Sequence, residues 1–212
     1  MIRLTPDQLM QLAPKSVQRC RDAFANADDV LAKYDINGNA LRLAHFMAQI
    51  LHESGGLSII EENLSYSATR MMQVWPKRFP TLDAAKPYAK NPRALANKVY
   101  GGRMGNTSAD DGWLYIGRGL LQITGRESYD KYGQRLGCNL VGEPRLASDP
   151  QWALCIAAEE WTDKGCNAYA DEDDITTITK RINGGLIGFD ERKKWLVKTK
   201  QVWVTAEAPA SP

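Results

Sequence analysis

The chain has 212 residues, of which 43% are hydrophobic and 25% are charged, and this length suffices to bury a core without metal or disulfide support. The 27 basic and 25 acidic side chains leave a net charge of +2, which is too small to favour nucleic acid as the main partner. We therefore expect a monomer with one globular domain over residues 1–204 and no nucleic-acid partner.

The sequence predicts neither a membrane segment nor a metal site. Charged side chains interrupt residues 1–30, so the apolar run of a signal peptide is missing and synthesis should end in the cytoplasm. There is no stretch of about 18 apolar residues, so we expect no stable membrane insertion. His45 and His52 could share a helix face, but no further zinc-spaced ligands accompany them. We expect no metal and no other cofactor.

The first predicted elements are helices. Thr5 and Pro6 have the cap and first-turn pattern of a helix that should run to about Leu12. A second amphipathic segment covers residues 17–31.

A central buried helix is predicted to follow. From Asn39, apolar side chains recur at three- and four-residue steps. Gly55 and Gly56 should end this helix, because glycine reaches the left-handed cap conformation without steric cost. Glu53 would then lie in the last turn.

The rest of the chain should divide into a loop-rich lobe and further helices. Residues 57–113 hold many prolines and glycines, and any β-structure is expected around residues 59–66. Helical patterns return at residues 126–136, 150–164, 173–182 and 190–204. The tail 205–212 has no apolar period and should be frayed. The fold class is therefore mainly α.

Two acidic positions suggest glycoside hydrolysis, which needs one protonated and one ionised carboxyl group. Glu53 would lie at a helix C-terminus beside apolar neighbours, and both features favour its protonated form. Beyond the double glycine, Glu62 is our choice for the base, with Glu61 as an alternative. An ion-paired Glu53 and a solvated Glu61–Glu62 pair are the competing interpretations.

Two further segments could support such a site. Residues 115–125 contain Gln122 and Thr124, which would share one side of an extended segment and could hold a sugar or a water; a tight structural turn is an equal alternative. Asn183 precedes two glycines, so it could form a helix C-cap or face a ligand. The basic region 181–200 fits a solvated helix face or a surface for an anionic polymer.

Together these segments resemble glycoside hydrolase family 19, the chitinase-like family with lysozyme-like members. The resemblance rests on four segments in the family's order, and it covers about residues 40–195. The segments are His52-Glu53-Ser54-Gly55-Gly56, residues 61–68, residues 115–124 with Tyr129, and Asn183-Gly184-Gly185. It implies a lysozyme-like, two-lobed helical domain with a cleft and a small β-hairpin or loop-rich lobe.

The resemblance also implies roles for particular residues. Glu53 matches the family's general acid and Glu62 its second acid, while Thr124 matches the hydroxyl residue that helps to hold the nucleophilic water. The positions that match substrate-contacting or site-supporting residues are Tyr66, Tyr115, Gln122 and Asn183. The family is known for inversion, which needs carboxyl groups roughly 6.5–9.5 Å apart.

The short gap between the two glutamates resembles the branch of phage endolysins. Such an enzyme would wait in the host cytoplasm, pass a holin pore and hydrolyse β-1,4 bonds of peptidoglycan glycan strands. Three alternatives remain: a chitinase, a lytic transglycosylase and an inactive wall-binding module.

Overall fold

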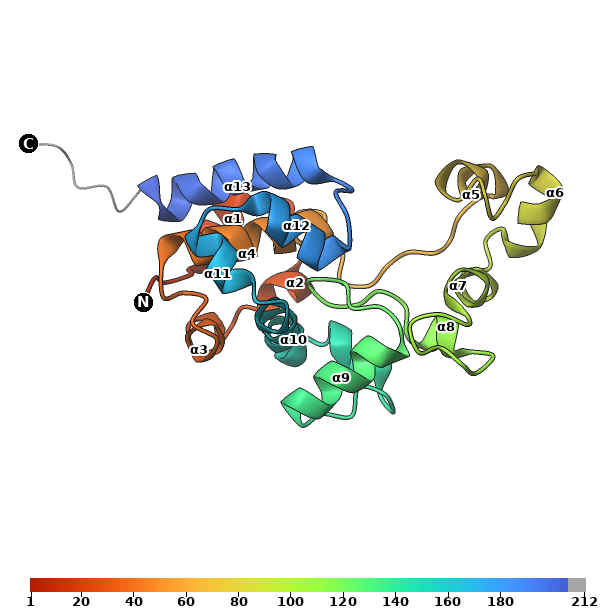
Figure 1. Ribbon diagram of the computed structural model, residues 1–212, viewed down its shortest axis with the longest axis horizontal. Coiled ribbons are helices and arrows are strands. Elements are labelled where there is room, and N and C mark those ends of the chain that lie inside the picture. The colour runs from red at the N-terminus through yellow and green to blue at the C-terminus, as the bar shows by residue number, and fades with distance from the viewer. Residues whose placement is uncertain (206–212) are drawn as a thin grey trace, which may run out of the picture. The chain divides into compact units, whose positions relative to one another are not determined.

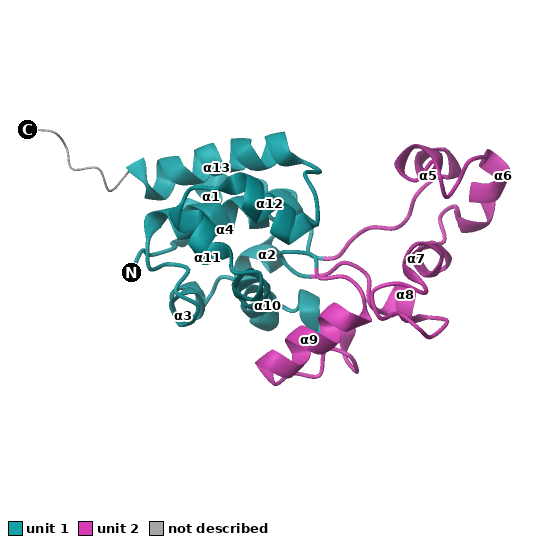
Figure 2. Ribbon diagram, viewed as in Figure 1, with its two compact units in different colours: residues 1–60, 119–122, 145–212 teal, residues 61–118, 123–144 magenta. Residues whose placement is uncertain are grey.

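The computed structural model describes residues 1–205, and these form helices joined by turns and loops (Figure 1). Contacts divide the chain into two compact units (Figure 2). Unit 1 comprises residues 1–60, residues 119–122 and the chain from residue 145 onward, and unit 2 comprises residues 61–118 and 123–144. The helical content confirms the mainly α fold class.

Unit 1 contains both ends of the described chain. Its helices are α1 Pro6–Leu12, α2 Gln18–Asp22, α3 Ala27–Lys33, α4 Ala40–Glu53, α10 Pro150–Asp163, α11 Cys166–Asp171, α12 Ile175–Asn183 and α13 Phe189–Trp203, with the 3₁₀ helix η2 Pro144–Ser148 leading into α10.

Helix α4 is the centre of unit 1. Asn39 caps it by accepting a hydrogen bond from the Arg42 N–H at 2.8 Å, and the residues from Leu43 to Leu51 are all buried. Helix α13 packs along α4 (Figure 1), where the Thr199 hydroxyl donates to the Ala44 carbonyl at 2.9 Å. The predicted central helix, with Glu53 in its last turn, is confirmed.

Unit 2 has shorter helices around a smaller core. They are α5 Ala68–Val74, α6 Leu82–Ala85, the 3₁₀ helix η1 Lys86–Tyr88, α7 Pro92–Tyr100, α8 Asp111–Leu114 and α9 Arg126–Leu136. The core includes Met71, Phe79 and Leu95, and edge-to-face contacts join Trp75 to Tyr66 and to Phe79. Residues 57–113, which were predicted to be rich in loops with short helices, contain short helices joined by loops.

One local prediction is wrong. The segment 17–31 forms two short helices, because the chain turns after Asp22 and this turn places Phe24 in the core. The β-structure expected around residues 59–66 is limited to an isolated bridge, in which Glu61 pairs with Arg118 of a loop. The other predicted helices are present within a few residues of the expected ends.

Residues 206–212, most of the predicted frayed tail, lie outside the described residues. Within residues 1–205, no helix has the length and apolarity to cross a bilayer. The same residues contain no group of three or more His, Cys, Asp or Glu side chains arranged to hold a metal ion.

Candidate active site

Glu53 is held by a buried arginine in unit 1. Arg192 of α13 donates hydrogen bonds to the Glu53 carboxylate and to the Gln49 side-chain oxygen, both on α4. The Arg192 side chain is 1% exposed and the Glu53 side chain 19%. This ion pair fixes the carboxylate at the end of α4, where the His-Glu-Ser-Gly-Gly motif places it.

The surroundings of Glu53 are less apolar than its neighbours in the sequence suggest. The neighbours Ile50, Leu51 and Leu57 are fully buried in the core of unit 1, while the Glu53 carboxylate meets a guanidinium. The proton-donating role expected for Glu53 stays a prediction from the family motif.

Another acid of unit 1, Glu160, is buried, and little in the sequence indicated this. Glu160 on α10 pairs with the Lys164 ammonium at 2.7 Å, and burial, together with the nearby Glu53 charge, raises the pKa of Glu160 despite this partner. The only signal in the sequence was the Glu–Lys spacing of four residues, which is common on solvated helices.

His52, next to Glu53, is a half-buried neutral side chain. Burial, and secondly the charge of Arg192, lower the pKa of His52. Its ring lies so close to Gly188 that a Cβ there would come within 2.4 Å. His52 therefore packs against the loop before α13.

In unit 2, Glu62 is held by two hydrogen-bond donors. The Gly117 N–H donates to Glu62 Oε1 at 2.7 Å, and the Tyr100 hydroxyl donates to Oε2 at 2.8 Å. Burial raises the pKa of Glu62, while these two bonds and the Arg118 charge oppose that rise. A general base works best when its pKa lies near the working pH, so this environment suits the role expected for Glu62.

Glu61 has a different, structural partner. The Arg118 Nε donates to Glu61 at 2.6 Å, and the Arg118 side chain is 6% exposed. Arg118 also donates to the Leu114 carbonyl and to the Tyr129 hydroxyl. Glu61 therefore neutralises a buried guanidinium, which favours Glu62 over Glu61 as the candidate base.

The motif 117–124 forms a tight turn. Arg118 and Ile123 make an isolated antiparallel bridge on either side of residues 119–122. Gly119 has a φ of 83°, and a Cβ there would lie 2.8 Å from the Ala147 carbonyl oxygen, so only glycine fits. The structural-turn interpretation of this motif is therefore correct for residues 119–122.

Of the two interpretations left open for Gln122, the turn applies and the extended segment does not. Gln122 has a φ of 59°, which is a left-handed conformation, and its amide donates to the Gly119 carbonyl at 2.7 Å. The turn, rather than a strand, decides where its side chain points. Thr124 is half-buried in unit 2.

The other predicted substrate-contacting residues differ in how far their side chains are exposed. Tyr115 is buried against Tyr129, and its hydroxyl donates to the Val141 carbonyl at 3.2 Å, so it supports the fold of unit 2. Tyr66 is half-buried beside Trp75. Asn183 is exposed at the end of α12, where the left-handed Gly184 forms the cap, and its side-chain amide donates to the Ile187 carbonyl at 3.5 Å.

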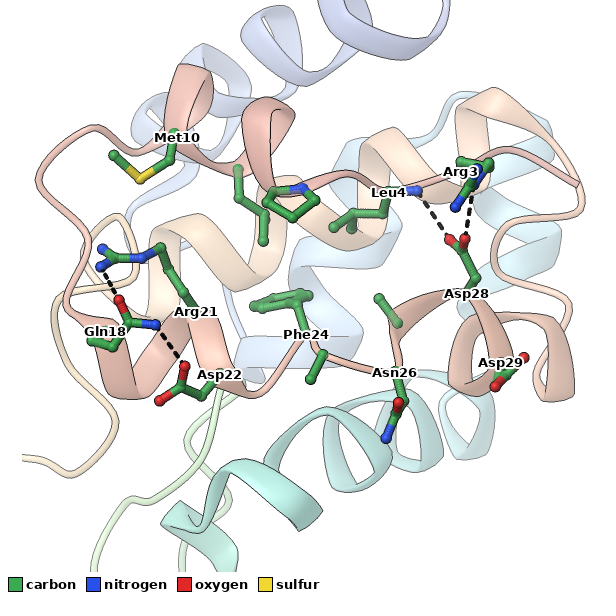
Figure 3. A pocket seen from close by; sticks show the side chains of 14 residues that line it. Arg3, Leu4, Met10, Gln18, Arg21, Asp22, Phe24, Asn26, Asp28 and Asp29 are labelled. Atoms are coloured by element: carbon green, nitrogen blue, oxygen red, sulfur yellow. Dashed lines mark hydrogen bonds and ion pairs between the residues drawn. The ribbon is translucent and has the colours of Figure 1, made fainter.

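A separate pocket of about 610 Å³ lies among the N-terminal helices of unit 1 (Figure 3). Phe24 lies in its middle, with Arg21 at one end and the Arg3–Asp28 pair at the other. Arg21 donates to the Gln18 side chain. Because most polar side chains that line the pocket form hydrogen bonds or ion pairs with one another, the pocket gives no indication of a ligand.

Comparisons with known proteins agree with this description. No protein-family model matches the chain. A glycosyl hydrolase family 19 domain-containing protein of Haemophilus influenzae is 39% identical over 158 residues, which are 74% of this chain and 77% of the relative.

Solved chitinase structures share the fold. Chitinase C from Streptomyces griseus aligns with a TM-score of 0.64 and 18% identity, covering 93% of this chain and 91% of its own. The family 19, class IV chitinase from Zea mays aligns with a TM-score of 0.60 and 17% identity. The alignment covers 93% of this chain and 91% of the chitinase chain. The lysozyme-like fold class is thereby confirmed. The identity to the H. influenzae relative shows that this chain belongs to glycosyl hydrolase family 19 and is a glycoside hydrolase.

Proposed function

We propose that this enzyme hydrolyses β-1,4-glycosidic bonds in the glycan strands of bacterial peptidoglycan. Family membership supports glycoside hydrolysis, and the chitinases among the structural relatives act, by their names, on a β-1,4-linked amino sugar polymer. The glycan of peptidoglycan has the same linkage between amino sugars, so the same chemistry applies to both.

The proposal depends mainly on the environment of the Glu62 carboxylate. A carboxylate that is half-buried, fixed by two donors and shifted upwards in pKa is suited to accept a proton from water. In the proposed reaction Glu62 activates the water, Thr124 helps to hold it, and Glu53 protonates the departing glycosidic oxygen. The anomeric centre inverts, as two carboxylates acting on opposite faces of the sugar require.

The biological role that we propose is that of an endolysin. The enzyme would be made in the host cytoplasm and reach the wall through a holin pore, where it acts without stable insertion into a membrane. The exposed basic side chains Lys193, Lys194 and Lys198 of α13 would face an anionic wall polymer. A chitinase is the second candidate, favoured by the names of the structural relatives.

A turbidity assay on permeabilised Gram-negative cells tests this proposal. We expect the wild-type enzyme to clear the suspension, and Glu53→Gln and Glu62→Gln each to slow clearing by about 10²-fold or more. Glu61→Gln is the matched control and should retain lysis if the protein stays folded. Wall binding without clearing by the wild type would instead identify an inactive binding module, and unchanged rates in both variants would refute the catalytic assignment.

A further inference from the structure

Unit 2 contains a pocket of about 420 Å³ that none of the catalytic assignments uses. One wall is the turn that follows α5, and the other is the end of α7 with the loop beyond it. Its lining residues are Val74, Trp75, Pro76, Lys77, Arg78, Val99, Tyr100 and Arg103. A volume of this size lies within the range of sites for small molecules and single sugar units.

The charged side chains that line this pocket are all basic. Lys77, Arg78 and Arg103 line it, and the lining includes no acidic side chain. Arg78 donates one hydrogen bond to the Val99 carbonyl at 2.8 Å and thereby ties the two walls together. Lys77 and Arg103 are exposed and make no ion pair with the part of the chain that the structure describes. A cationic pocket of this kind favours an anionic ligand.

The pocket also has a fixed aromatic wall. Trp75 is half-buried, and its ring makes edge contacts with Tyr66 at 5.3 Å and with Phe79 at 6.3 Å between centroids. Such packing holds the indole rigid, so it can offer an apolar face to a sugar ring at little cost in entropy. A pocket with cations beside an aromatic face suits a ligand that has both a sugar ring and an acidic group.

Tyr100 connects this pocket with the candidate base. It lines the pocket, and its hydroxyl donates to Glu62 at 2.8 Å. Arg103 is near enough to Tyr100 for its charge to act on the phenol. The Tyr100 side chain would therefore lie between a ligand in the pocket and the carboxylate that is proposed to activate water.

We propose that this pocket binds a carboxylate on the glycan substrate and makes the enzyme prefer peptidoglycan to neutral chitin. In peptidoglycan the carboxylate belongs to the lactyl ether of a muramic acid unit without a peptide, or to the peptide that is amide-linked to this ether, whereas N-acetylglucosamine polymers have none. The inference rests on the proposed function. Lys77 and Arg103 are its specificity-determining residues, and Arg78 mainly holds the two walls.

The test compares the double variant Lys77→Gln/Arg103→Gln with the wild type. Neither side chain makes a hydrogen bond or an ion pair within residues 1–205, so the melting temperature should change little. The matched control, Lys98→Gln/Arg19→Gln, removes one exposed lysine and one exposed arginine outside the pocket. Steady-state kinetics are measured on intact peptidoglycan, on glycan strands stripped of peptides, and on N-acetylglucosamine oligomers.

We expect the pocket variant to raise KM on peptidoglycan roughly three- to tenfold with little change in kcat, since two partly solvated charge pairs are lost. A rise on intact peptidoglycan that disappears on stripped strands assigns the peptide carboxylate, and a rise that is larger on stripped strands, where the lactyl carboxyl group is no longer amide-linked, assigns the lactyl carboxylate. KM on the neutral oligomers should not change.

Two results would overturn the inference while leaving the proposed function intact: an unchanged KM on both intact peptidoglycan and stripped strands, or an equal rise on neutral oligomers. A wild-type enzyme that cleaves only the neutral oligomers would overturn both proposals.

Discussion

The Tyr100 hydroxyl donates a hydrogen bond of 2.8 Å to the Glu62 carboxylate, across 38 residues of sequence. Burial raises the pKa of Tyr100 far above its usual value, so the phenol keeps its proton and remains a donor. The bond stabilises the ionised form of Glu62, whereas burial stabilises the protonated form. Tyr100 thus helps to set the pH above which Glu62 is ionised, as the base proposed for this enzyme must be.

Substituting Tyr100→Phe should move the acidic limb of the pH profile of kcat/KM to higher pH. The lost hydrogen bond had lowered the pKa of Glu62, so its removal lets burial raise that pKa further. Activity should fall most at low pH and recover as the pH rises. Tyr88→Phe, another half-buried tyrosine of unit 2, should leave the profile unchanged. An equal loss at every pH would contradict this role of Tyr100.

Glu62→Gln should abolish activity but stabilise the folded protein at neutral pH. Because burial raises the folded-state pKa of Glu62 above the unfolded value of 4.5, its contribution to stability is complete below that value and is lost as the pH rises through the folded pKa. Glutamine carries no charge and avoids this loss. Thermal melts of both proteins should therefore diverge with rising pH, with the variant melting higher. A difference in melting temperature that stays constant across the pH range would contradict this coupling between Glu62 protonation and stability.

Arg192→Ala should destabilise unit 1 by about 3–5 kcal/mol, because it leaves the partly buried Glu53 carboxylate without its partner. Chemical denaturation measures the loss. Lys193→Ala is the neighbouring control: its ion pair with Asp190 is exposed, so it should cost no more than about 1 kcal/mol. Equal effects of the two substitutions would mean that the buried pair contributes little.

Gly119→Ala should destabilise the protein more than Gly137→Ala does. Both glycines have positive φ, but a Cβ at Gly119 would lie 2.8 Å from the Ala147 carbonyl oxygen, while nothing lies within 4 Å at Gly137. The Gly137 variant therefore measures the backbone strain alone, about 1–2 kcal/mol. We expect the Gly119 variant to lose a further ~1–3 kcal/mol, and equal losses would exclude the close contact.

Local patterns in the sequence predicted the position of Glu53 well. Its helix has an unbroken apolar period, a capping Asn39 and two terminal glycines, and each of these acts within a few residues along the chain. The helices α9, α10 and α13 were predictable for the same reason. The turn at residues 119–122 was one of two open interpretations, because a short glycine-flanked run fits both a strand and a turn.

The partners of the two glutamates could not be predicted in the same way. Arg192 meets Glu53 across 139 residues, and Tyr100 meets Glu62 across 38. Arg192 lies in a basic stretch that looks like a solvated helix face, and Tyr100 ends an ordinary amphipathic helix. Only the folded chain brings these side chains to the carboxylates, so the electrostatics of both glutamates depend on tertiary packing.

Mass spectrometry of the products from purified peptidoglycan tests the central claim most directly. Hydrolysis with water activated by Glu62 should yield fragments that end in reducing sugars, and Glu62→Gln should yield almost none. Fragments that end in 1,6-anhydro sugars would show that no water attacks the anomeric carbon, and would contradict the two-carboxylate hydrolysis proposed for this enzyme.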